Sequence, residues 1–332
     1  MNPMAQLRDT FGRTVTNLRI SVTDRCNYRC SYCMPEEGMQ WLEREKLLTY
    51  EEIVRLARIF ASLGVRKIRL TGGEPLMRKE LHRLIAMLKV IPGIDNIALT
   101  TNGYFLKEQA KALAAAGLDR INVSLDALDP RIFAEMARRD YFHQTWEGIE
   151  EAERAGIAPI KLNVVLVRGV NDGEILKFAH LARSRPFFVR FIEFMPIGMD
   201  DGWTMEKVVP THEVLETINR YASLVPAPSS NGKVPAERYI FSDGKGEIGF
   251  ISSVSRPFCA DCDRVRITSD GKFRTCLFSL VETDLRAMLR HNASDEAIAE
   301  TLVRAVWKKE EGHLINRPGF VRPERTMSQI GG

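Results

Sequence analysis

The sequence lacks the features that define several classes of protein. No run approaches the roughly 18 apolar residues of a membrane span, and Met1 to Arg13 lacks the apolar segment of a secretory signal, so we expect a cytoplasmic protein without a membrane partner. The net charge of +4 is small for 332 residues and argues against a general nucleic-acid-binding surface, although it leaves room for a local anion pocket. The pattern GxxxxGKS or GxxxxGKT is also absent, so no P-loop would hold a nucleotide.

Cysteine is scarce and unevenly placed. The six cysteines form two groups of three, Cys26, Cys30 and Cys33 near the start and Cys259, Cys262 and Cys276 far downstream. An odd number in each group leaves one thiol over or forces bonds between the groups, and a reducing cytosol disfavours such bonds. We therefore expect the cysteines to be ligands rather than disulfide partners.

Residues 1–195 predict repeated strand–helix units. Six β-like runs alternate with helical patterns, at 18–23, 67–71, 97–101, 120–126, 160–167 and 188–193. This alternation is typical of a parallel sheet. The first helix begins with a capping box of Thr49 and Glu52 and ends at Gly64. We expect an α/β fold whose first part is a partial, TIM-like (βα)6 barrel.

Several of the expected strands alternate strictly between apolar and polar residues. Leu18, Ile20 and Val22 interleave with polar residues, and the same pattern recurs in 67–71 and 160–164. If helices cover the apolar face, the other face forms a polar lumen suited to a polar ligand. An antiparallel sheet with its polar face in water is the alternative.

The composition changes after residue 195, and residues 196–332 are expected to form a smaller α+β region that completes the active site. The Pro-, Ser- and Gly-rich segment 222–237 predicts a mobile loop. Runs 264–268 and 272–276 predict a hairpin whose two loop residues are Asp270 and Gly271, which places Cys276 opposite Val265. Helices are expected at 282–291 and, capped by Ser294, at 295–309.

The first cysteine triplet directly follows the first expected strand, where barrel enzymes carry active-site loops. A four-iron four-sulfur cluster needs one ligand per iron, so three cysteines leave one iron open to a small molecule. Zinc with a fourth ligand from elsewhere is the alternative, although no His lies near Cys26. The glycines of Thr71–Pro75 (TGGEP) allow a ligand close to the backbone, and the acid can receive an amino group; alone, this segment would be an ordinary turn.

The second triplet is gathered by the hairpin and implies a second cluster with an open iron, with a structural zinc as the alternative. Arg264 and Arg266 project from one face of a hairpin strand. With Arg19, Arg69 and Lys161 facing the lumen, five cations could converge on one polyphosphate. A solvated basic face is the alternative for any single one of them.

Together these features resemble the GTP 3′,8-cyclase family of the radical S-adenosylmethionine superfamily. The resemblance covers nearly the whole chain, through both triplets and the segments TGGEP (71–75), TTNG (100–103), INVSLDA (121–127), KLNVV (161–165), FIEFM (191–195) and the terminal Gly331-Gly332. It implies that reduction of the first cluster cleaves S-adenosylmethionine to a 5′-deoxyadenosyl radical. This radical would remove the C3′ hydrogen of GTP, and C3′ would then attack C8 of guanine, in the first step of molybdenum cofactor biosynthesis.

The resemblance also implies residue roles. The catalytic residues would be the first triplet, Arg264 and Arg266, and both triplets would bind iron. Contacts to S-adenosylmethionine would come from Tyr32, Gly73, Ser124 and Met195. Contacts to GTP would come from Arg19, Arg69, Thr100, Lys161, Arg264 and Arg266, and the guanine would bind the open iron of the second cluster.

The implied partners are an electron donor such as flavodoxin or ferredoxin and the cyclic pyranopterin monophosphate synthase downstream, with the chain as a monomer or homodimer. The terminal Gly331-Gly332 would reach into the active site. Two other functions remain open: another radical enzyme with an auxiliary cluster, for example one that modifies a peptide, and a non-enzymatic zinc protein that binds nucleic acid.

Overall fold

The computed structural model describes residues 6–198, 202–228 and 236–331. The strands are β1 (Asn17–Ser21), β2 (Lys67–Thr71), β3 (Asn96–Thr101), β4 (Arg120–Ser124), β5 (Ile160–Leu166), β6 (Phe187–Glu193), β7 (Leu224–Pro226), β8 (Glu237–Phe241), β9 (Glu247–Ile251), β10 (Arg264–Ile267), β11 (Lys272–Arg274) and β12 (Thr283–Asp284). The α-helices are α1 (Tyr50–Ser62), α2 (Leu81–Lys89), α3 (Leu106–Ala115), α4 (Pro130–Ala137), α5 (Phe142–Arg154), α6 (Ile175–Ser184), α7 (Thr211–Tyr221), α8 (Leu285–Arg290), α9 (Asp295–Trp307) and α10 (Met327–Ile330).

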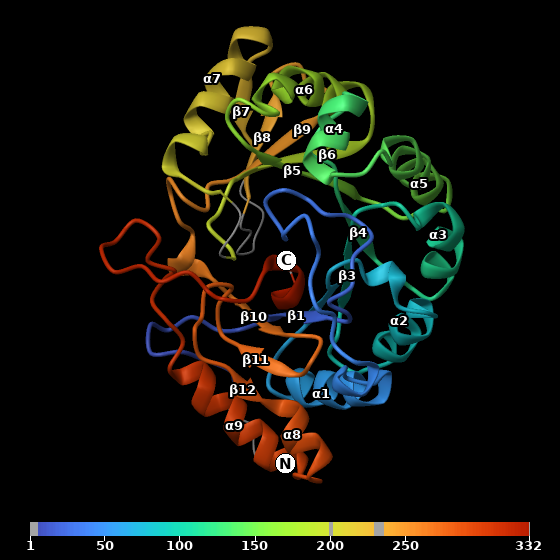
Figure 1. Ribbon diagram of the computed structural model, residues 1–332, viewed down its shortest axis with the longest axis vertical. Helices are drawn as coiled ribbons and strands as arrows, with labels where there is room; N and C mark the ends of the chain where they lie inside the picture. Colours follow the sequence, from blue (N-terminus) through green and yellow to red (C-terminus); the bar gives the residue numbers. More distant parts are fainter. Residues whose placement is uncertain (1–5, 199–201, 229–235, 332) are drawn as a thin grey trace.

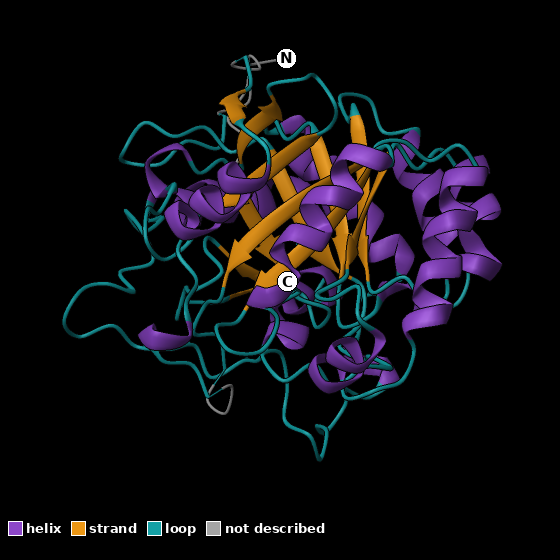
Figure 2. Ribbon diagram, turned by 90° about the horizontal axis from the view of Figure 1, so that it is seen from above, coloured by secondary structure: helices purple, strands orange, loops and turns teal. Residues whose placement is uncertain are grey.

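The strands form one curved sheet in the order β12-β11-β10-β1-β2-β3-β4-β5-β6-β9-β8-β7. The six strands of the first part, β1 to β6, lie in chain order and pair in parallel. Helices surround this sheet on its outer face, as Figure 1 and Figure 2 show from two directions. The prediction of a partial parallel (βα)6 barrel is confirmed, and the antiparallel alternative is wrong for these six strands.

The alternation read from the sequence explains how the barrel packs. Along β5, every second residue from Ile160 to Leu166 is buried, while Lys161, Asn163 and Val165 between them are partly accessible. The buried face packs under the helices, and the other face turns to the lumen. The predicted cap of α1 is also present, because Thr49 accepts from the Glu52 amide and Glu52 accepts from the Thr49 amide.

Strands from residues 196–332 extend the six-stranded sheet at both edges. β10 pairs in parallel with β1, so that Arg266 lies beside Arg19, and β9 pairs in parallel with β6. β11 and β12 continue one edge in antiparallel fashion, and β8 and β7 continue the other. The second part of the chain therefore supplies walls on both sides of the lumen.

The predicted register of the hairpin is wrong by one residue. Arg266 pairs with Arg274 and Ile267 with Phe273, so the loop has three residues, 269–271, instead of two. Gly271 has a positive φ of 77°, and the Thr268 hydroxyl accepts from the Lys272 amide at 2.9 Å. This three-residue turn with a left-handed glycine competes with the two-residue turn, and the threonine contact stabilises it.

Two other expectations for this region can be judged. The predicted loop 222–237 contains strand β7, which pairs with β8, so the loop prediction is wrong there; residues 229–235 lie outside the described residues. The two predicted helices are present as α8 and α9, and Ser294 caps α9 by accepting from the Ala297 amide. No helix in the described part of the chain has the length and apolar character needed to cross a membrane.

Candidate active site

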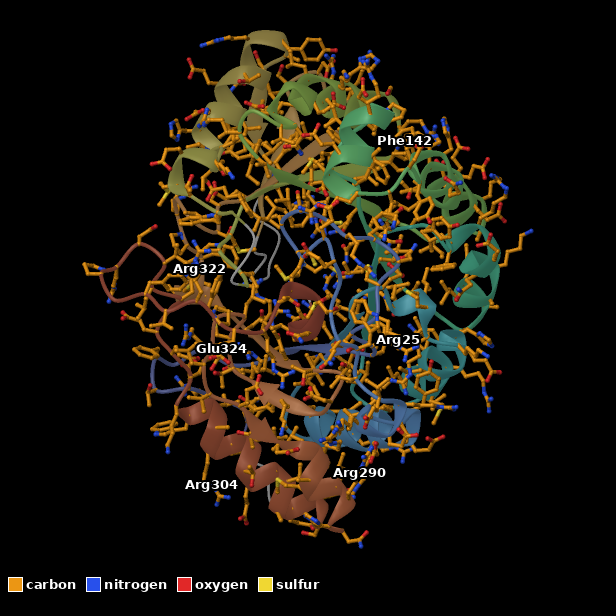
Figure 3. All side chains as sticks on the ribbon, viewed as in Figure 1. Arg25, Phe142, Arg290, Arg304, Arg322 and Glu324 are labelled. Atoms are coloured by element: carbon orange, nitrogen blue, oxygen red, sulfur yellow. The ribbon has the colours of Figure 1, made fainter. Side chains whose placement is uncertain are left out.

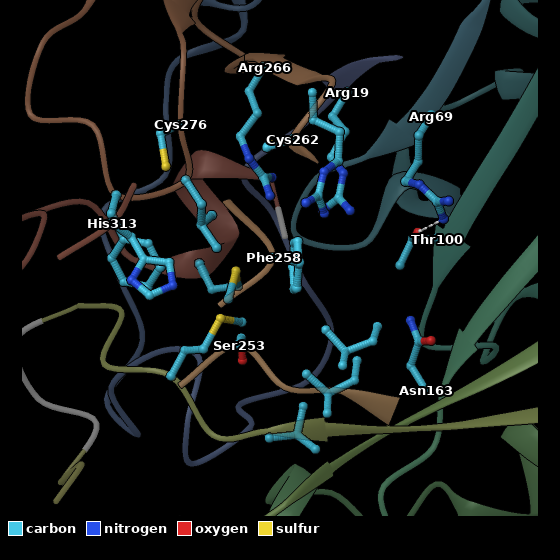
Figure 4. A pocket seen from close by; sticks show the side chains of 18 of the residues that line it. Arg19, Arg69, Thr100, Asn163, Ser253, Phe258, Cys262, Arg266, Cys276 and His313 are labelled. Carbon is cyan, nitrogen blue, oxygen red and sulfur yellow. Dashed lines mark hydrogen bonds between the residues drawn. The ribbon is translucent and has the colours of Figure 1, made fainter. Parts of the chain in front are cut away.

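A cavity of about 250 Å³ occupies the lumen of the barrel and is closed on one side by the second cysteine triplet. Its walls come from all six barrel strands, the loops after β1 and β6, β9, the hairpin and the tail. The predicted site residues that line it are Arg19, Tyr32, Arg69, Thr100, Ser124, Met195, Cys259, Cys262, Arg264, Arg266 and Cys276. Figure 4 shows Arg69 at one end of this space and Cys276 at the other, with Arg19 and Arg266 between them.

Some predicted residues do not line this cavity. Cys30 lines a smaller cavity next to it, and Tyr32, Ser124 and Asp126 belong to both. Cys30 of the first triplet therefore lies next to the main cavity, across these shared residues. Lys161 lies two residues before the cavity-lining Asn163 on the lumen face of β5, deeper in the barrel, and Gly73 lies beside the first cysteine loop.

The first triplet lies in the loop after β1, and exposed Arg25, labelled in Figure 3, precedes it directly. Burial raises the pKa of Cys26 and Cys33 to about 12, and burial together with Cys33 raises the pKa of Cys30. Buried thiols of this kind ionise when a metal binds them. The Tyr28 amide and the Asn102 side-chain amide approach Cys26 Sγ at 3.4 and 3.9 Å. Such N–H donors stabilise thiolate ligands.

The geometry of the thiols distinguishes the two candidate metals. Three thiolates on one zinc ion lie about 3.8 Å apart, since each Zn–S bond is about 2.3 Å, whereas a cluster gives each thiolate its own iron. Among the described residues, no three His, Cys, Asp or Glu side chains are arranged to hold a single metal ion. Three cysteines, each able to bind its own iron, fit a four-iron four-sulfur cluster with one open iron at each triplet.

The Gly-Gly-Glu-Pro segment packs directly on the first cysteine loop. A Cβ at Gly73 would collide with the carbonyl oxygens of Asp24 and Arg25, so only glycine fits this position. Glu74 is completely buried and accepts from the Thr101 hydroxyl and the Asn102 amide, both at 2.7 Å. Burial raises the pKa of Glu74 to about 7. The suggestion that this acid receives a ligand amino group is wrong, because its carboxylate turns inward and holds the end of β3.

Asp126 is a site residue that sequence reasoning missed. Its carboxylate accepts from the Tyr32 hydroxyl at 2.6 Å and from the Val165 amide at 2.8 Å. Burial raises the pKa of Asp126 to about 6. The pair fixes Tyr32 beside Ser124 and Met195 in the cavity wall. An acid at the end of the alternating run 120–126 was the available signal.

The second triplet faces the cavity from three elements. Cys259 lies in a short 3₁₀-helix (Cys259–Asp261), Cys262 precedes β10, and Cys276 follows β11. Although burial alone would raise it, the pKa of Cys262 is lowered by Arg264 and Lys309 and by hydrogen bonds from Arg264. His313, also missed from the sequence, lines the cavity here (Figure 4).

Buried cations dominate the opposite part of the lumen. Arg266, Arg19 and Arg69 are neighbours in register across β10, β1 and β2. Burial first, and then repulsion from neighbouring arginines, lowers the pKa of all three, that of Arg266 to about 9. Arg69 also donates to the Thr100 hydroxyl at 3.1 Å. Cations at this density in a buried space indicate a polyanionic ligand.

Arg190 on β6 belongs to this basic group and was also missed. It donates to the side chains of Asn122 at 2.8 Å and Asn163 at 2.5 Å, and burial lowers its pKa to about 10. Lys161 lies over the Phe188 ring at 4.9 Å. Burial, Arg190, Arg120 and Arg69 lower the pKa of Lys161 to about 7. An arginine within the apolar run 187–192 was the signal for Arg190.

The C-terminal tail enters the barrel mouth, where Figure 1 shows the chain end at the centre of the molecule. Arg266 donates a hydrogen bond to the Gly331 carbonyl, and Met327 lines the cavity. Arg325 fastens the tail to the hairpin through Asp270, at 3.0 Å, and to Glu282. Gly331 lies at the site, as predicted for the tail. Gly332 lies outside the described residues.

The fold and site are those of a radical S-adenosylmethionine enzyme with a second thiol triplet. Residues 20–182 match the model of the Radical SAM superfamily, and residues 187–315 match Molybdenum Cofactor Synthesis C. Streptococcus suis SuiB bound to S-adenosylmethionine superposes with a TM-score of 0.64 over 96% of this chain and 78% of its own, at 14% identity. This likeness supports the fold.

Closer relatives define the family. The chain is 47% identical to a GTP 3′,8-cyclase of Streptomyces coelicolor, over 98% of this chain and 96% of the relative. It is also 47% identical to that of Pelotomaculum thermopropionicum, over 98% of this chain and 100% of the relative. The chain belongs to the GTP 3′,8-cyclase family.

Proposed function

We propose that this protein converts GTP to (8S)-3′,8-cyclo-7,8-dihydroguanosine 5′-triphosphate, the first step of molybdenum cofactor biosynthesis. The observation that carries the proposal is the arrangement around one cavity: Cys30 of the first triplet lies next to one side, the three thiols of the second triplet line another, and buried or half-buried arginines line the space between. When bound, the first cluster would supply the electron that cleaves S-adenosylmethionine, and the resulting radical would take the C3′ hydrogen of GTP.

The side of the cavity near the first triplet suits S-adenosylmethionine. Cys26, Cys30 and Cys33 would hold the cluster, and the backbone at Gly73 would receive the methionine amino group. Tyr32, held by Asp126, would contact the adenine, and Ser124 and Met195 would complete the pocket. Apolar Val165 and Ile192 in the wall limit access of water to a reactive intermediate.

The opposite side suits GTP. Arg19, Arg69 and Lys161, together with Thr100, would bind the triphosphate, since they are half-buried cations and a hydroxyl donor on the lumen side of the strands. Cys259, Cys262 and Cys276 would hold the second cluster, whose open iron would bind guanine.

Arg264 and Arg266 would orient the nucleotide between the two clusters. Arg266 also holds the tail at Gly331, so substrate and tail would meet at the same guanidinium. In this proposal residues 1–195 form the radical barrel and residues 196–332 supply the second cluster and complete the site.

The cellular setting is part of the proposal. An electron donor such as flavodoxin or ferredoxin would reduce the first cluster, and cyclic pyranopterin monophosphate synthase would use the product. A reducing cytoplasm suits six free thiols that hold clusters. The chain would act as a monomer or homodimer.

The decisive experiment is anaerobic reconstitution followed by incubation with S-adenosylmethionine, GTP and a reductant. We expect about eight iron and eight sulfide per chain, formation of 5′-deoxyadenosine, and the cyclised nucleotide in equal amount. The Cys26→Ala variant serves as the control without cleavage. Binding of a peptide but not GTP would instead indicate another radical enzyme, and about two zinc without sulfide would indicate a zinc protein.

A further inference from the structure

Lys309 is a buried cation outside the basic group of the lumen. It follows the C-terminal end of α9, where its amide donates to the Val306 carbonyl at 2.9 Å, and only 3% of the residue is exposed. The neighbouring Lys308 is exposed. The adjoining backbone is held by Arg13, whose guanidinium donates to the Glu310 and Glu311 carbonyls at 2.5 and 2.8 Å. The ammonium group of Lys309 is thus fixed in place rather than snorkelling to solvent.

The contacts of Lys309 lie close in sequence to two cysteines of the second triplet. Its Nζ donates to the Arg264 carbonyl at 2.9 Å and also to the Thr275 carbonyl. Arg264 begins β10 two residues after Cys262, and Thr275 directly precedes Cys276. One ammonium group therefore links the backbone beside two of the three thiols.

In the described part of the chain, Lys309 forms no ion pair with a carboxylate. No carboxylate oxygen of the described residues lies within 4.0 Å of Lys309 Nζ, the distance limit for an ion pair, whereas buried Arg13 is paired with Asp9. The nearby Glu310 carboxylate accepts from the Thr275 hydroxyl at 2.6 Å. A buried unpaired cation is costly, so this position requires an anion. The candidates are the thiolates of Cys262 and Cys276, because Lys309 is bonded to the backbone close to both cysteines.

We propose that Lys309 is a positioning residue of the second cluster: its ammonium group ties together the backbone at Cys262 and Cys276 and balances the charge of the iron-bound thiolates. This inference rests on the second cluster of the proposed function. Loss of the charge should lower the reduction potential of that cluster, because a nearby cation stabilises the extra electron. Loss of the carbonyl contacts should weaken the binding of iron by the second triplet.

The test uses the full chain with Cys26, Cys30 and Cys33 replaced by Ala, so that iron at the second triplet gives the whole signal. Lys309→Met, Lys309→Gln and Lys309→Arg are compared in this background, and Lys308→Met is the matched control with the same charge change at an exposed position. After anaerobic reconstitution, we measure iron and sulfide per chain, the rate of iron loss to a chelator, and the potential from spectroscopically monitored titration.

We expect about four iron in the parent chain and in the Lys308→Met control. Lys309→Met should lose iron roughly tenfold faster or more, as for other residues that hold metal ligands in place. Lys309→Gln keeps a donor without the charge and should shift the potential downward, and Lys309→Arg should restore it. Should Lys309→Met not fold, the Gln and Arg variants decide the question.

Unchanged iron loss and potential in Lys309→Met, or in Lys309→Gln where Met does not fold, would overturn the role of Lys309 while leaving the second cluster in place. A parent chain that takes up no iron would overturn the second cluster, and with it both this inference and the proposed function.

Discussion

Protonation of Lys161 should make GTP binding depend on pH in a direction fixed by the structure. In the free protein, burial and the charges of Arg190, Arg120 and Arg69 hold the pKa of Lys161 at about 7. A bound triphosphate would offset those positive charges and raise the pKa. A group whose pKa is higher in the complex takes up a proton on binding. GTP affinity should therefore be highest below pH 7 and fall as the pH rises above it.

The magnitude follows from the same value. At pH 8, one unit above the pKa of about 7, roughly one Lys161 in ten carries its proton before binding. Protonation of Lys161 on binding therefore costs about 1.4 kcal/mol at this pH, which corresponds to about tenfold weaker GTP binding. Proton uptake at this pH should approach about 0.9 per bound GTP, provided that the complex holds the lysine fully charged.

Isothermal titration of the anaerobic protein at pH 6.5 to 8.5, in buffers of different ionisation enthalpy, measures both quantities. Lys161→Arg is the matched control, because a guanidinium keeps its charge across this range. It also corrects for the terminal phosphate of GTP, whose own pKa lies at about 6 to 7. Equal proton uptake by the wild type and by Lys161→Arg at pH 8 would refute the reasoning.

Three further predictions test other parts of the site. Cys26→Ala should abolish formation of 5′-deoxyadenosine while about four iron remain at the second triplet; continued cleavage would count heavily against the first cluster as the reactive one. Arg266→Ala should raise the Kd for GTP about tenfold or more, as expected when a charged hydrogen-bond donor is removed, or misplace the bound nucleotide; unchanged binding and turnover would exclude its assigned role. Deletion of Gly331 and Gly332 should abolish turnover with about eight iron retained, and loss of iron in that variant would show instead that the tail stabilises the clusters.

The barrel could be predicted from the sequence because its strands alternate. The strands β2 and β5 begin and end within one residue of their expected positions, since burial of one face repeats every two residues. β7 could not be predicted, because Pro226 ends it and it lies at the edge of the sheet, where a short strand leaves little pattern.

A site residue could be predicted where its own residue type and its position on a strand were enough to mark it. Arg19 and Arg69 are charged residues on strands that the pattern buries, and the structure places both in the cavity wall. The Tyr32–Asp126 hydrogen bond joins residues 94 positions apart, and its formation depends on the path of the first cysteine loop. Arg190 was hidden because its neighbours in β6 are large and apolar, so that the strand reads as core.

The error in the hairpin register has a consequence for the second triplet. In antiparallel pairs, residues directly opposite each other share a face of the sheet, so the predicted pairing would have put Cys276 on the face of Val265. Val265 is fully buried on the face opposite to the lumen. The observed pairing of Arg266 with Arg274 brings Cys276, two residues on, to the face of Arg264. The three-residue turn at Gly271 is therefore what allows this thiol to line the same cavity as the arginines, and a two-residue turn would have removed it from the site.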